Sequence, residues 1–403
     1  MGAFPLVLLL SDPNLQYLIA IGGGLIGGVA AGFLWTAQGA YFATSAKLYA
    51  EAHEDGSVTA QQATASLASL FGAIFLGFEL LLKIAPLASV IADEGSSYNA
   101  NATASSPPPA LPPYPPRMAP PIPLFSPNDD GGTQPKGSDV IIAIVYSICA
   151  IMSSIAMASI WDLEKRQVAS SINGDATDHT SDPPAAVPPR PKLSLAKIMS
   201  AVLLWCKEPA VMLLAPVQVT FGLCAALLGN LVAHQVVPKT FPDRVATAAG
   251  CLSALVALIA ALLQYPFSKT AAHVGKPPLM ISGLLAFGGL AVLCLLLDIE
   301  QLAATGTLVS CYALQGVGRA CYEGTNKALY ADFFPNDTEA AFSNIVLANG
   351  IASAVGFFLF PSLANGTMAS IALVSAGIAM IGYLGAEVLR KCKPTSFEQP
   401  ESL

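Results

Sequence analysis

The chain has 403 residues, of which 54% are hydrophobic and only 11% are charged, and its mean hydropathy is +0.60. An ordinary soluble domain has about 25% charged residues, and a soluble chain of this size has no interior large enough to bury so much apolar surface. The composition therefore excludes a soluble globular protein, a disordered protein and a disulfide scaffold. The net charge of −7 argues against a nucleic-acid partner. We expect an all-α polytopic membrane protein whose main partner is the lipid bilayer.

Nine segments are long and apolar enough to cross a bilayer, which takes about 20 residues per helix. In chain order they are 15–43, 62–92, 139–161, 207–232, 244–267, 278–298, 303–331, 338–361 and 367–389. The apolar stretch 1–10 is too short to cross and is interpreted as an N-terminal stub, since it has neither the basic start nor the cleavage site of a signal peptide. Two long loops interrupt the spans, a Pro-rich loop over 93–138 and a Ser/Asp/Pro-rich loop over 162–206.

Lysine and arginine in the loops predict the orientation, because they accumulate on the cytoplasmic side. When the 162–206 loop is placed in the cytoplasm and the spans alternate from it, the inner side has eleven basic residues and the outer side four. The inner set is Lys47, Lys165, Arg166, Arg190, Lys192, Lys197, Lys269, Lys276, Arg390, Lys391 and Lys393. The sequence thus predicts an integral multi-pass protein with a cytoplasmic tail over 390–403, in either the plasma membrane or an endomembrane.

Glycosylation sequons test this orientation, because only sites outside the cytoplasm are modified. Asn101 and Asn365 begin sequons on the predicted outer side, so we expect a glycoprotein modified at these two positions. Asn336 begins a third sequon on the predicted inner side and is expected to be bare.

The spans are distributed unequally around the 162–206 loop, with three and the stub before it and six after it. A charged cytoplasmic loop followed by six helices is the layout of a major facilitator protein, which has two six-helix halves. We therefore expect an N-terminal half-bundle over 1–161, an inter-half loop over 162–206 and a C-terminal six-helix half-bundle over 207–389. On this interpretation the first half lacks its first two helices and part of the third. A genuine nine-helix protein is the alternative.

Two segments resemble a known family. Leu34 to Tyr41 (LWTAQGAY) resembles the fourth-helix signature of the Unc-ninety-three-like family, a branch of the major facilitator superfamily. Residues 315–343 (QGVGRACYEGTNKALYADFFPNDTEAAFS) are similar, more loosely, to that family's tenth helix and the loop after it. The resemblance implies a twelve-helix facilitator fold. It also implies a regulatory function, since animal members act as ion-channel regulators or as chaperones for the trafficking of membrane receptors.

Charged side chains inside the predicted spans are costly and are therefore candidates for function. Arg319, Glu323 and Lys327 follow one another at four-residue intervals and share one helix face, where Glu323 can satisfy both cations. They are predicted either to line a central cavity or to form a salt-bridge network between helices. Glu79 and Lys83 have the same spacing and predict an intramembrane ion pair, with a proton-coupling role for Glu79 as the alternative.

Other polar and small residues extend this candidate set. Trp35, Gln38 and Tyr41 lie along one side of their helix and are predicted either to contact a ligand or to mark the membrane interface, and Gln218 is a further cavity candidate. Gly24, Gly28 and Gly32 repeat every four residues and predict a helix-packing surface, within the chain or toward a partner.

No catalytic, cofactor or metal motif appears in the sequence, so we expect no enzyme activity, no cofactor and no metal site. The eight cysteines form no CxxC pair and are interpreted as small apolar residues. The leading hypothesis is a membrane protein that regulates or chaperones an ion channel or receptor. The alternative is a secondary transporter of a small organic solute, in which Arg319 holds an anionic group and Glu323 or Glu79 couples protons.

Overall fold

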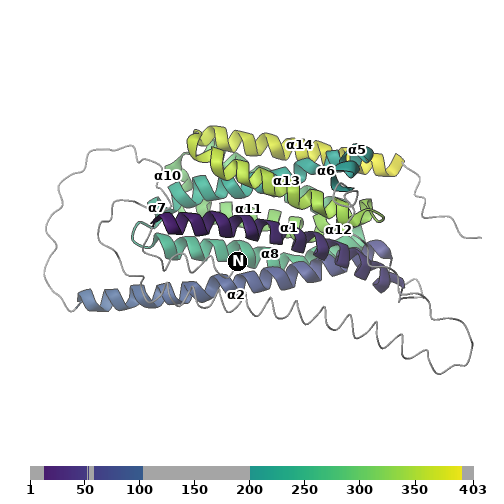
Figure 1. Ribbon diagram of the computed structural model, residues 1–403. Coiled ribbons are helices and arrows are strands. Elements are labelled where there is room, and N and C mark those ends of the chain that lie inside the picture. Colours follow the sequence, from purple (N-terminus) through teal and green to yellow (C-terminus); the bar gives the residue numbers. More distant parts are fainter. Residues whose placement is uncertain (1–12, 52, 54–58, 103–199, 393–403) are drawn as a thin grey trace, which may run out of the picture. The chain divides into compact units, whose positions relative to one another are not determined.

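A computed structural model describes residues 13–51, 53, 59–102 and 200–392, and every regular element in these ranges is a helix (Figure 1). The predicted span 139–161 and most of both long loops lie outside the described residues. The chain divides into two compact units, with a boundary between Ala31 and Gly32. The described part of the first unit is the helical stretch 13–31. All contacts below belong to the second unit, which contains residues 32–102 and 200–392 among those described.

In chain order, the helices are α1 (Pro13–Glu51), α2 (Ala60–Ala102), α5 (Ser200–Lys207), α6 (Pro209–Leu227), η3 (Leu228–Val236), α7 (Val237–Thr240), α8 (Val245–Val274), α9 (Pro277–Leu296), α10 (Ile299–Leu302), α11 (Thr305–Cys321), η4 (Tyr322–Asn326), α12 (Lys327–Phe333), α13 (Thr338–Leu359), η5 (Phe360–Ser362) and α14 (Asn365–Cys392). Several are continuous: α6 runs through η3 into α7, and α11 runs through η4 into α12.

Six stretches of the described helices are long and apolar enough to cross a membrane: Gln61–Ile84, Pro209–Thr240, Val245–Val274, Pro277–Leu296, Thr338–Ser362 and Asn365–Cys392. Each overlaps a span expected from the sequence. The expected spans 15–43 and 303–331 are also helical, within α1 and within the continuous α11–η4–α12 helix. The second of these contains three charged residues within nine positions, which lowers its apolar character. The helical bundle and its apolar spans describe an integral multi-pass membrane protein.

The structure differs from the sequence expectation at helix ends. Helix α5 occupies the last part of the expected inter-half loop, and α14 continues to Cys392, past the expected end at 389. Between α8 and α9 only Gly275 and Lys276 are non-helical. Gly275 ends α8 because it adopts φ 88°, a left-handed value that favours glycine, and Pro277 then begins α9. This short turn holds Lys276 at a defined position.

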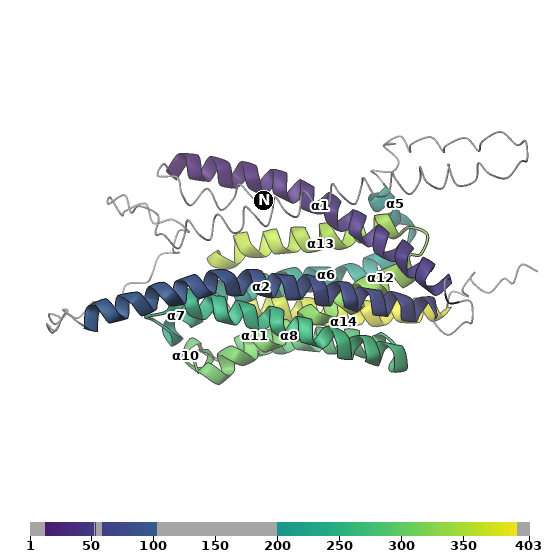
Figure 2. The same cartoon turned by 90° about the horizontal axis from the view of Figure 1, so that it is seen from below.

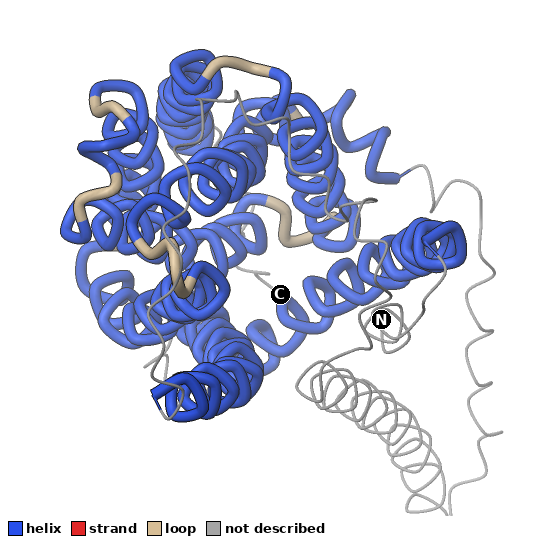
Figure 3. The backbone as a smooth tube through the Cα atoms, turned by 90° about the vertical axis from the view of Figure 1, so that its left-hand side faces the viewer, coloured by secondary structure: helices blue, strands red, loops and turns tan. Residues whose placement is uncertain are grey.

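We call the end of the bundle with α5 and α12 the inner end, and the end with α7 and α10 the outer end (Figure 1). Lys276 lies at the inner end, since it pairs with Asp332 of α12. Helix α2 packs along α8, and α6 packs against both α13 and α14 (Figure 2). Helices α9 and α11 also pack side by side, and a view along the bundle shows the helices as roughly parallel rods (Figure 3). Buried apolar side chains form one cluster toward the inner end, including Leu214 and Tyr383, and a second toward the outer end, including Leu231 and Leu308.

Glycines make several of these helix contacts possible, as expected where helices associate in lipid. A Cβ atom added at Gly382 of α14 would lie closer than 3.0 Å to the backbone carbonyl oxygen of Leu213 in α6, and one at Gly222 would lie 2.8 Å from the backbone nitrogen of Ser353. By contrast, a Cβ atom at Gly377, also in α14, would meet no described atom within 4 Å. The two α14 glycines therefore occupy opposite environments on one helix.

We expect Gly382→Ala to destabilise the protein by about 1–3 kcal/mol. The new methyl group would clash with the backbone of Leu213, which cannot move aside as a side chain can by changing its rotamer. Gly377→Ala is the matched control and should leave stability unchanged or slightly higher, since alanine favours helix. The shift in the thermal unfolding midpoint of the full chain in detergent measures both. Equal shifts for the two variants would contradict the packing described.

Candidate functional site

The interior charges of α2 and α11 pair with each other. Arg319 of α11 donates two hydrogen bonds to Glu79 of α2, from Nη1 to Oε1 at 2.9 Å and from Nη2 to Oε2 at 2.5 Å. Lys83, one turn further along α2, lies 2.8 Å from Glu79 Oε1 and donates a second bond of 3.2 Å to the backbone oxygen of Ser253 in α8. One carboxylate thus joins two cations and, through them, three helices.

This pairing differs from the expectation that Glu323 serves both Arg319 and Lys327. Glu323 contacts Lys327 at 2.7 Å, and Arg319 turns instead to a helix 240 positions earlier in the chain. The two ion pairs also differ in environment. The Glu323 and Lys327 side chains are 8% exposed, whereas those of Glu79, Arg319 and Lys83 retain about a fifth to a quarter of their exposure (19–25%).

Lys327 also lies against three aromatic rings, which we call the lysine cage. Its Nζ is 4.5 Å from the ring centre of Trp35, 5.1 Å from Phe71 and 6.0 Å from Phe75. Trp35 meets the two phenylalanines edge-on, and the phenylalanine rings are parallel to each other. A desolvated cation over aromatic faces gains about 2 kcal/mol per favourable contact. The cage and Glu323 together stabilise the buried ammonium.

The π-helical turn η4 places Glu323 in this position. All five residues of η4 are buried, and π-helical turns frequently mark functional sites. At its far end Asn326 exchanges two amide hydrogen bonds with Gln218 of α6, at 3.0 and 3.2 Å. Gly324 lies against Gln264 of α8, which in turn contacts Gly72 of α2 and donates to the backbone oxygen of Ala320 at 3.0 Å. The turn is thus held between α2, α6 and α8.

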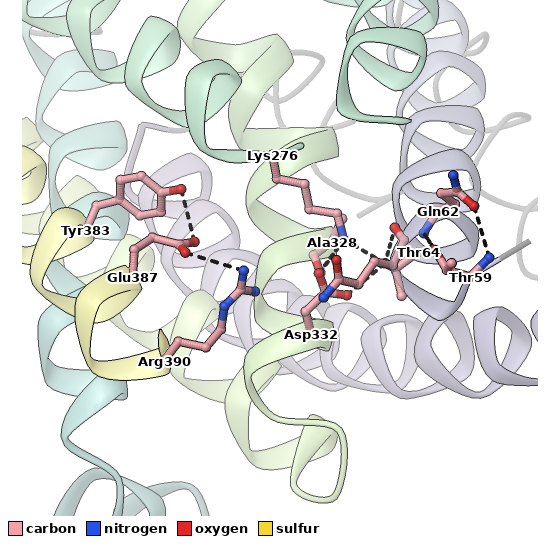
Figure 4. A network of polar contacts seen from close by, with 10 residues as sticks. Thr59, Gln62, Thr64, Lys276, Ala328, Asp332, Tyr383, Glu387 and Arg390 are labelled. Carbon is pink, nitrogen blue, oxygen red and sulfur yellow. Dashed lines mark hydrogen bonds and ion pairs between the residues drawn. The ribbon is translucent and has the colours of Figure 1, made fainter. Parts of the chain in front are cut away.

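A second network lies at the inner end, around Lys276 (Figure 4). Its Nζ is 2.5 Å from Asp332 Oδ2 and 2.7 Å from Thr64 Oγ1, and Thr64 donates to Asp332 at 2.8 Å. Burial lowers the pKa of Lys276 and raises the pKa of Asp332, and the partner's charge opposes the shift in each case. This contact joins the α8–α9 turn to α12 and α2.

The inner network continues on α14. The Tyr383 hydroxyl donates to Glu387 at 3.2 Å, and Glu387 pairs with Arg390 at 3.4 Å (Figure 4). The Arg390 guanidinium also lies 5.0 Å from the centre of the Phe333 ring. Sequence reasoning missed this network. The available signal was the basic glycine turn at Lys276 together with Asp332 just past a predicted span, but nothing in the sequence places Thr64 beside them.

The structure brings some of the predicted site residues together and leaves others apart. The interior clusters contain six of the predicted site residues: Trp35, Glu79, Lys83, Arg319, Glu323 and Lys327. Gln218 is linked to η4, which contains Glu323, by its hydrogen bonds with Asn326. Gln38 is half-buried, and its Oε1 has no hydrogen-bond partner among the described groups. Tyr41 is 76% exposed and joins none of these clusters. The ligand and cavity roles of all these residues stay predictions.

Other predicted positions have simpler surroundings. A Cβ atom added at Gly24, Gly28 or Gly32 meets no atom within 4 Å in the part of the chain that the structure describes, and the packing role of this surface stays a prediction. Asn365 begins α14, and its amide nitrogen donates to Gln235 at 3.1 Å. Asn101 lies in the last turn of α2. Among the described residues no group of three or more His, Cys, Asp or Glu side chains is placed to hold a metal ion.

We expect Glu79→Gln to cost about 2–4 kcal/mol, because it leaves Arg319 and Lys83 without their shared anion in a partly buried site. Lys83→Gln is the matched control and should cost less than about 1 kcal/mol, since the bidentate Arg319–Glu79 pair remains. Thermal unfolding in detergent compares the two. A Lys83→Gln loss as large as the Glu79→Gln loss would contradict the prediction that the Arg319–Glu79 pair is the main contribution of this cluster to stability.

Lys327→Met should cost more than about 3 kcal/mol, because it strands the Glu323 carboxylate in the apolar interior. Adding Glu323→Gln should recover most of this loss, since a neutral pair of similar volume replaces a buried ion pair at little cost. The unfolding midpoints of the single and double variants measure the coupling. Purely additive losses would exclude the direct pairing.

Residues 244–402 match the family model described as the Major Facilitator Superfamily, a region that runs from the start of α8 through α14. A search of the curated proteins and a search of the solved structures find no match to the chain. The matched region contains four of the six apolar spans, and it agrees with an all-α bundle of major facilitator type. The matched region is less than half of the chain, and it is this region that is similar to the major facilitator superfamily.

Proposed function

We propose that this protein is a membrane-embedded regulator or chaperone of an ion channel or receptor, of the Unc-ninety-three-like type. One observation carries the proposal: helix α2 is fastened to α8, α11 and α12 at several successive levels, from its inner end to its middle. Such fastening favours a bundle with one fixed conformation that presents its surface to another membrane protein.

The fastening points follow one another along α2. Thr64 bonds the Lys276–Asp332 pair near the inner end. Phe71 and Phe75 contact Lys327, and Gly72 contacts Gln264, near the middle. Further along, at the midpoint of the helix, Glu79 bonds Arg319 and Lys83 bonds Ser253. The Glu79 contact is the one whose loss would leave a charge, that of Arg319, unpaired, because the Lys276–Asp332 and Lys327–Glu323 pairs include no residue of α2.

Alternating access requires a transporter to separate its packed helices at one end while the other end stays closed. Separation from the inner end would break the bonds of Thr64 with Lys276 and Asp332, and separation that reaches the middle of α2 from either end would leave Arg319 without Glu79. Breaking one buried ion pair costs about 3–5 kcal/mol when a charge is left behind. A fixed scaffold avoids both costs.

The lipid-facing surface of the bundle is suited to a membrane partner. Large apolar side chains are exposed on several helices, among them Phe358 at 85% and Ile381 at 73%. In a bilayer these groups meet lipid tails or the helices of another membrane protein, so a regulator can bind its partner without a cavity. This supports an interaction within the membrane.

A second candidate is a secondary transporter of a small organic solute, coupled to protons. The family match favours it, because proteins of this superfamily are generally transporters. In this candidate Arg319 holds an anionic group of the solute when Glu79 is protonated, and Glu323 releases Lys327 in the same way. The ion pairs described above would then belong to a closed state.

Water access to the α2 interface separates the two candidates. We expect Ala68→Cys and Leu76→Cys, both buried on α2, to resist a small maleimide, because the scaffold does not open. Exposed Gln61→Cys on the same helix is the matched control and should be labelled fully. The experiment uses the full chain in membrane vesicles, in a background that lacks the other cysteines.

Rapid labelling of either buried position would contradict a fixed scaffold. Labelling that a solute changes, together with uptake of that solute into vesicles that is lost in Arg319→Ala, would establish the transporter instead. A regulator predicts the reverse: the activity or surface density of a channel or receptor depends on the chain while no solute flux accompanies it.

A further inference from the structure

Two buried cysteines face each other across the contact between α9 and α11. Neither belongs to the charge clusters, and the inference does not depend on the proposed function. Cys294 lies near the outer end of α9, and Cys311 lies in the outer half of α11. Both are buried and free, as are all the buried cysteines that the structure describes.

The register of the two helices can be derived from their closest contacts. A Cβ atom added at Gly283 of α9 would overlap Cys321 of α11, and one added at Gly318 of α11 would overlap the Phe287 ring of α9. Residue numbers therefore rise along α9 as they fall along α11, which is an antiparallel pairing. These contacts also show that the two helices approach each other closely.

This register places the two thiols opposite each other. Cys294 is seven residues beyond Phe287, and Cys311 is seven residues before Gly318. Seven residues are about two full helical turns, so both side chains return to the shared face at the same height.

A cavity of about 240 Å³ connects Cys294 with the outer surface. Cys294 lines it together with Asp298, Asn365 and Gly366, and of these Asp298 and Gly366 are exposed. A volume of this size holds several water molecules, each of which takes about 30 Å³ in the liquid. A molecule as small as hydrogen peroxide can therefore reach Cys294 from the side that the sequence predicts to be non-cytoplasmic, where thiols are commonly oxidised.

We propose that Cys294 and Cys311 form a redox-active dithiol, which a peroxide converts to a disulfide between α9 and α11. The Cys294 sulfur attacks one peroxide oxygen, so that an S–O bond forms, the O–O bond breaks and one water leaves. The Cys311 sulfur then attacks the Cys294 sulfur, so that the S–S bond forms and the S–O bond breaks. The second oxygen leaves as water with the remaining proton, and the two thiols have reduced one peroxide to two waters.

The disulfide joins α9 to α11. Cys294 of α9 lines the cavity, and α11 carries Arg319 and continues into η4, which contains Glu323. Cys224 of α6 is the competing partner, but its thiol contacts the backbone oxygen of Phe287, at a distance of 3.9 Å. Phe287 lies two turns away from Cys294 along α9, whereas Cys311 lies directly across from it. The register therefore favours Cys311 as the partner.

Non-reducing peptide mapping tests the proposal on the full chain in membrane vesicles. After treatment with hydrogen peroxide and alkylation of the remaining thiols, we expect a cross-linked peptide that contains Cys294 and Cys311. We also expect the loss of two alkylatable thiols, which a dithiol reductant restores. Exposed Cys251 reports that the oxidant is active.

Matched variants identify the pair. Cys294→Ser and Cys311→Ser should each abolish the cross-link, whereas Cys321→Ser, on the same α11 helix, and Cys224→Ser should keep it. Peptide mapping of the wild-type chain identifies the two joined cysteines directly, so it tests the proposal even if a variant folds poorly. A cross-link between Cys294 and Cys224, or oxidation of Cys251 while Cys294 and Cys311 stay reduced, would overturn the proposal.

Discussion

A carboxylate that binds two cations in an apolar interior is the interaction on which the arrangement of α2 depends. Glu79 accepts both guanidinium bonds of Arg319 and the ammonium of Lys83, and Lys83 reaches on to the backbone of α8. In the described structure, Arg319 and Lys83 share this one carboxylate as their ion-pair partner. Since burying any one of them alone is strongly unfavourable, α2 must lie against α11 and α8 at this height.

The position of α2 in turn determines where Lys327 can lie. Phe71 and Phe75 are two and one turns before Glu79 on the same helix, and they complete the lysine cage only when α2 is in place. Glu323 neutralises Lys327 from within its own helix, so this pair adds no link between helices through charge. The cage supplies that link through the aromatic faces. A charge contact therefore fixes α2 at its middle. The cation–π contacts of Phe71 and Phe75, one to two turns closer to the inner end, depend on that position.

Local patterns in the sequence predict the helices and two of the ion pairs, Glu79–Lys83 and Glu323–Lys327, but they cannot predict contacts between distant segments. Glu79 and Lys83 are four residues apart, so the helix period alone brings them together. The same rule misled for Arg319 and Glu323, which share a spacing but not a contact, because a cation on a helix surface can turn to a neighbouring helix. That neighbour is 240 residues away in sequence, and no periodicity encodes the distance. For the same reason, the sequence does not predict the contact of Thr64 with Lys276. Nor does it predict that Cys294 lies opposite Cys311, which depends on the register of two helices.

The charge balance of the three clusters bears on the transporter alternative. Lys276 balances Asp332 and Lys327 balances Glu323, so each of these pairs is neutral. The Glu79 cluster contains one anion and two cations and is therefore one charge positive, and it is also the most exposed of the three. An uncompensated cation in lipid is stable only where water or an anion can reach it. If any interior position of this protein meets an external anionic group, the Glu79 cluster is the position where the electrostatics already favour one.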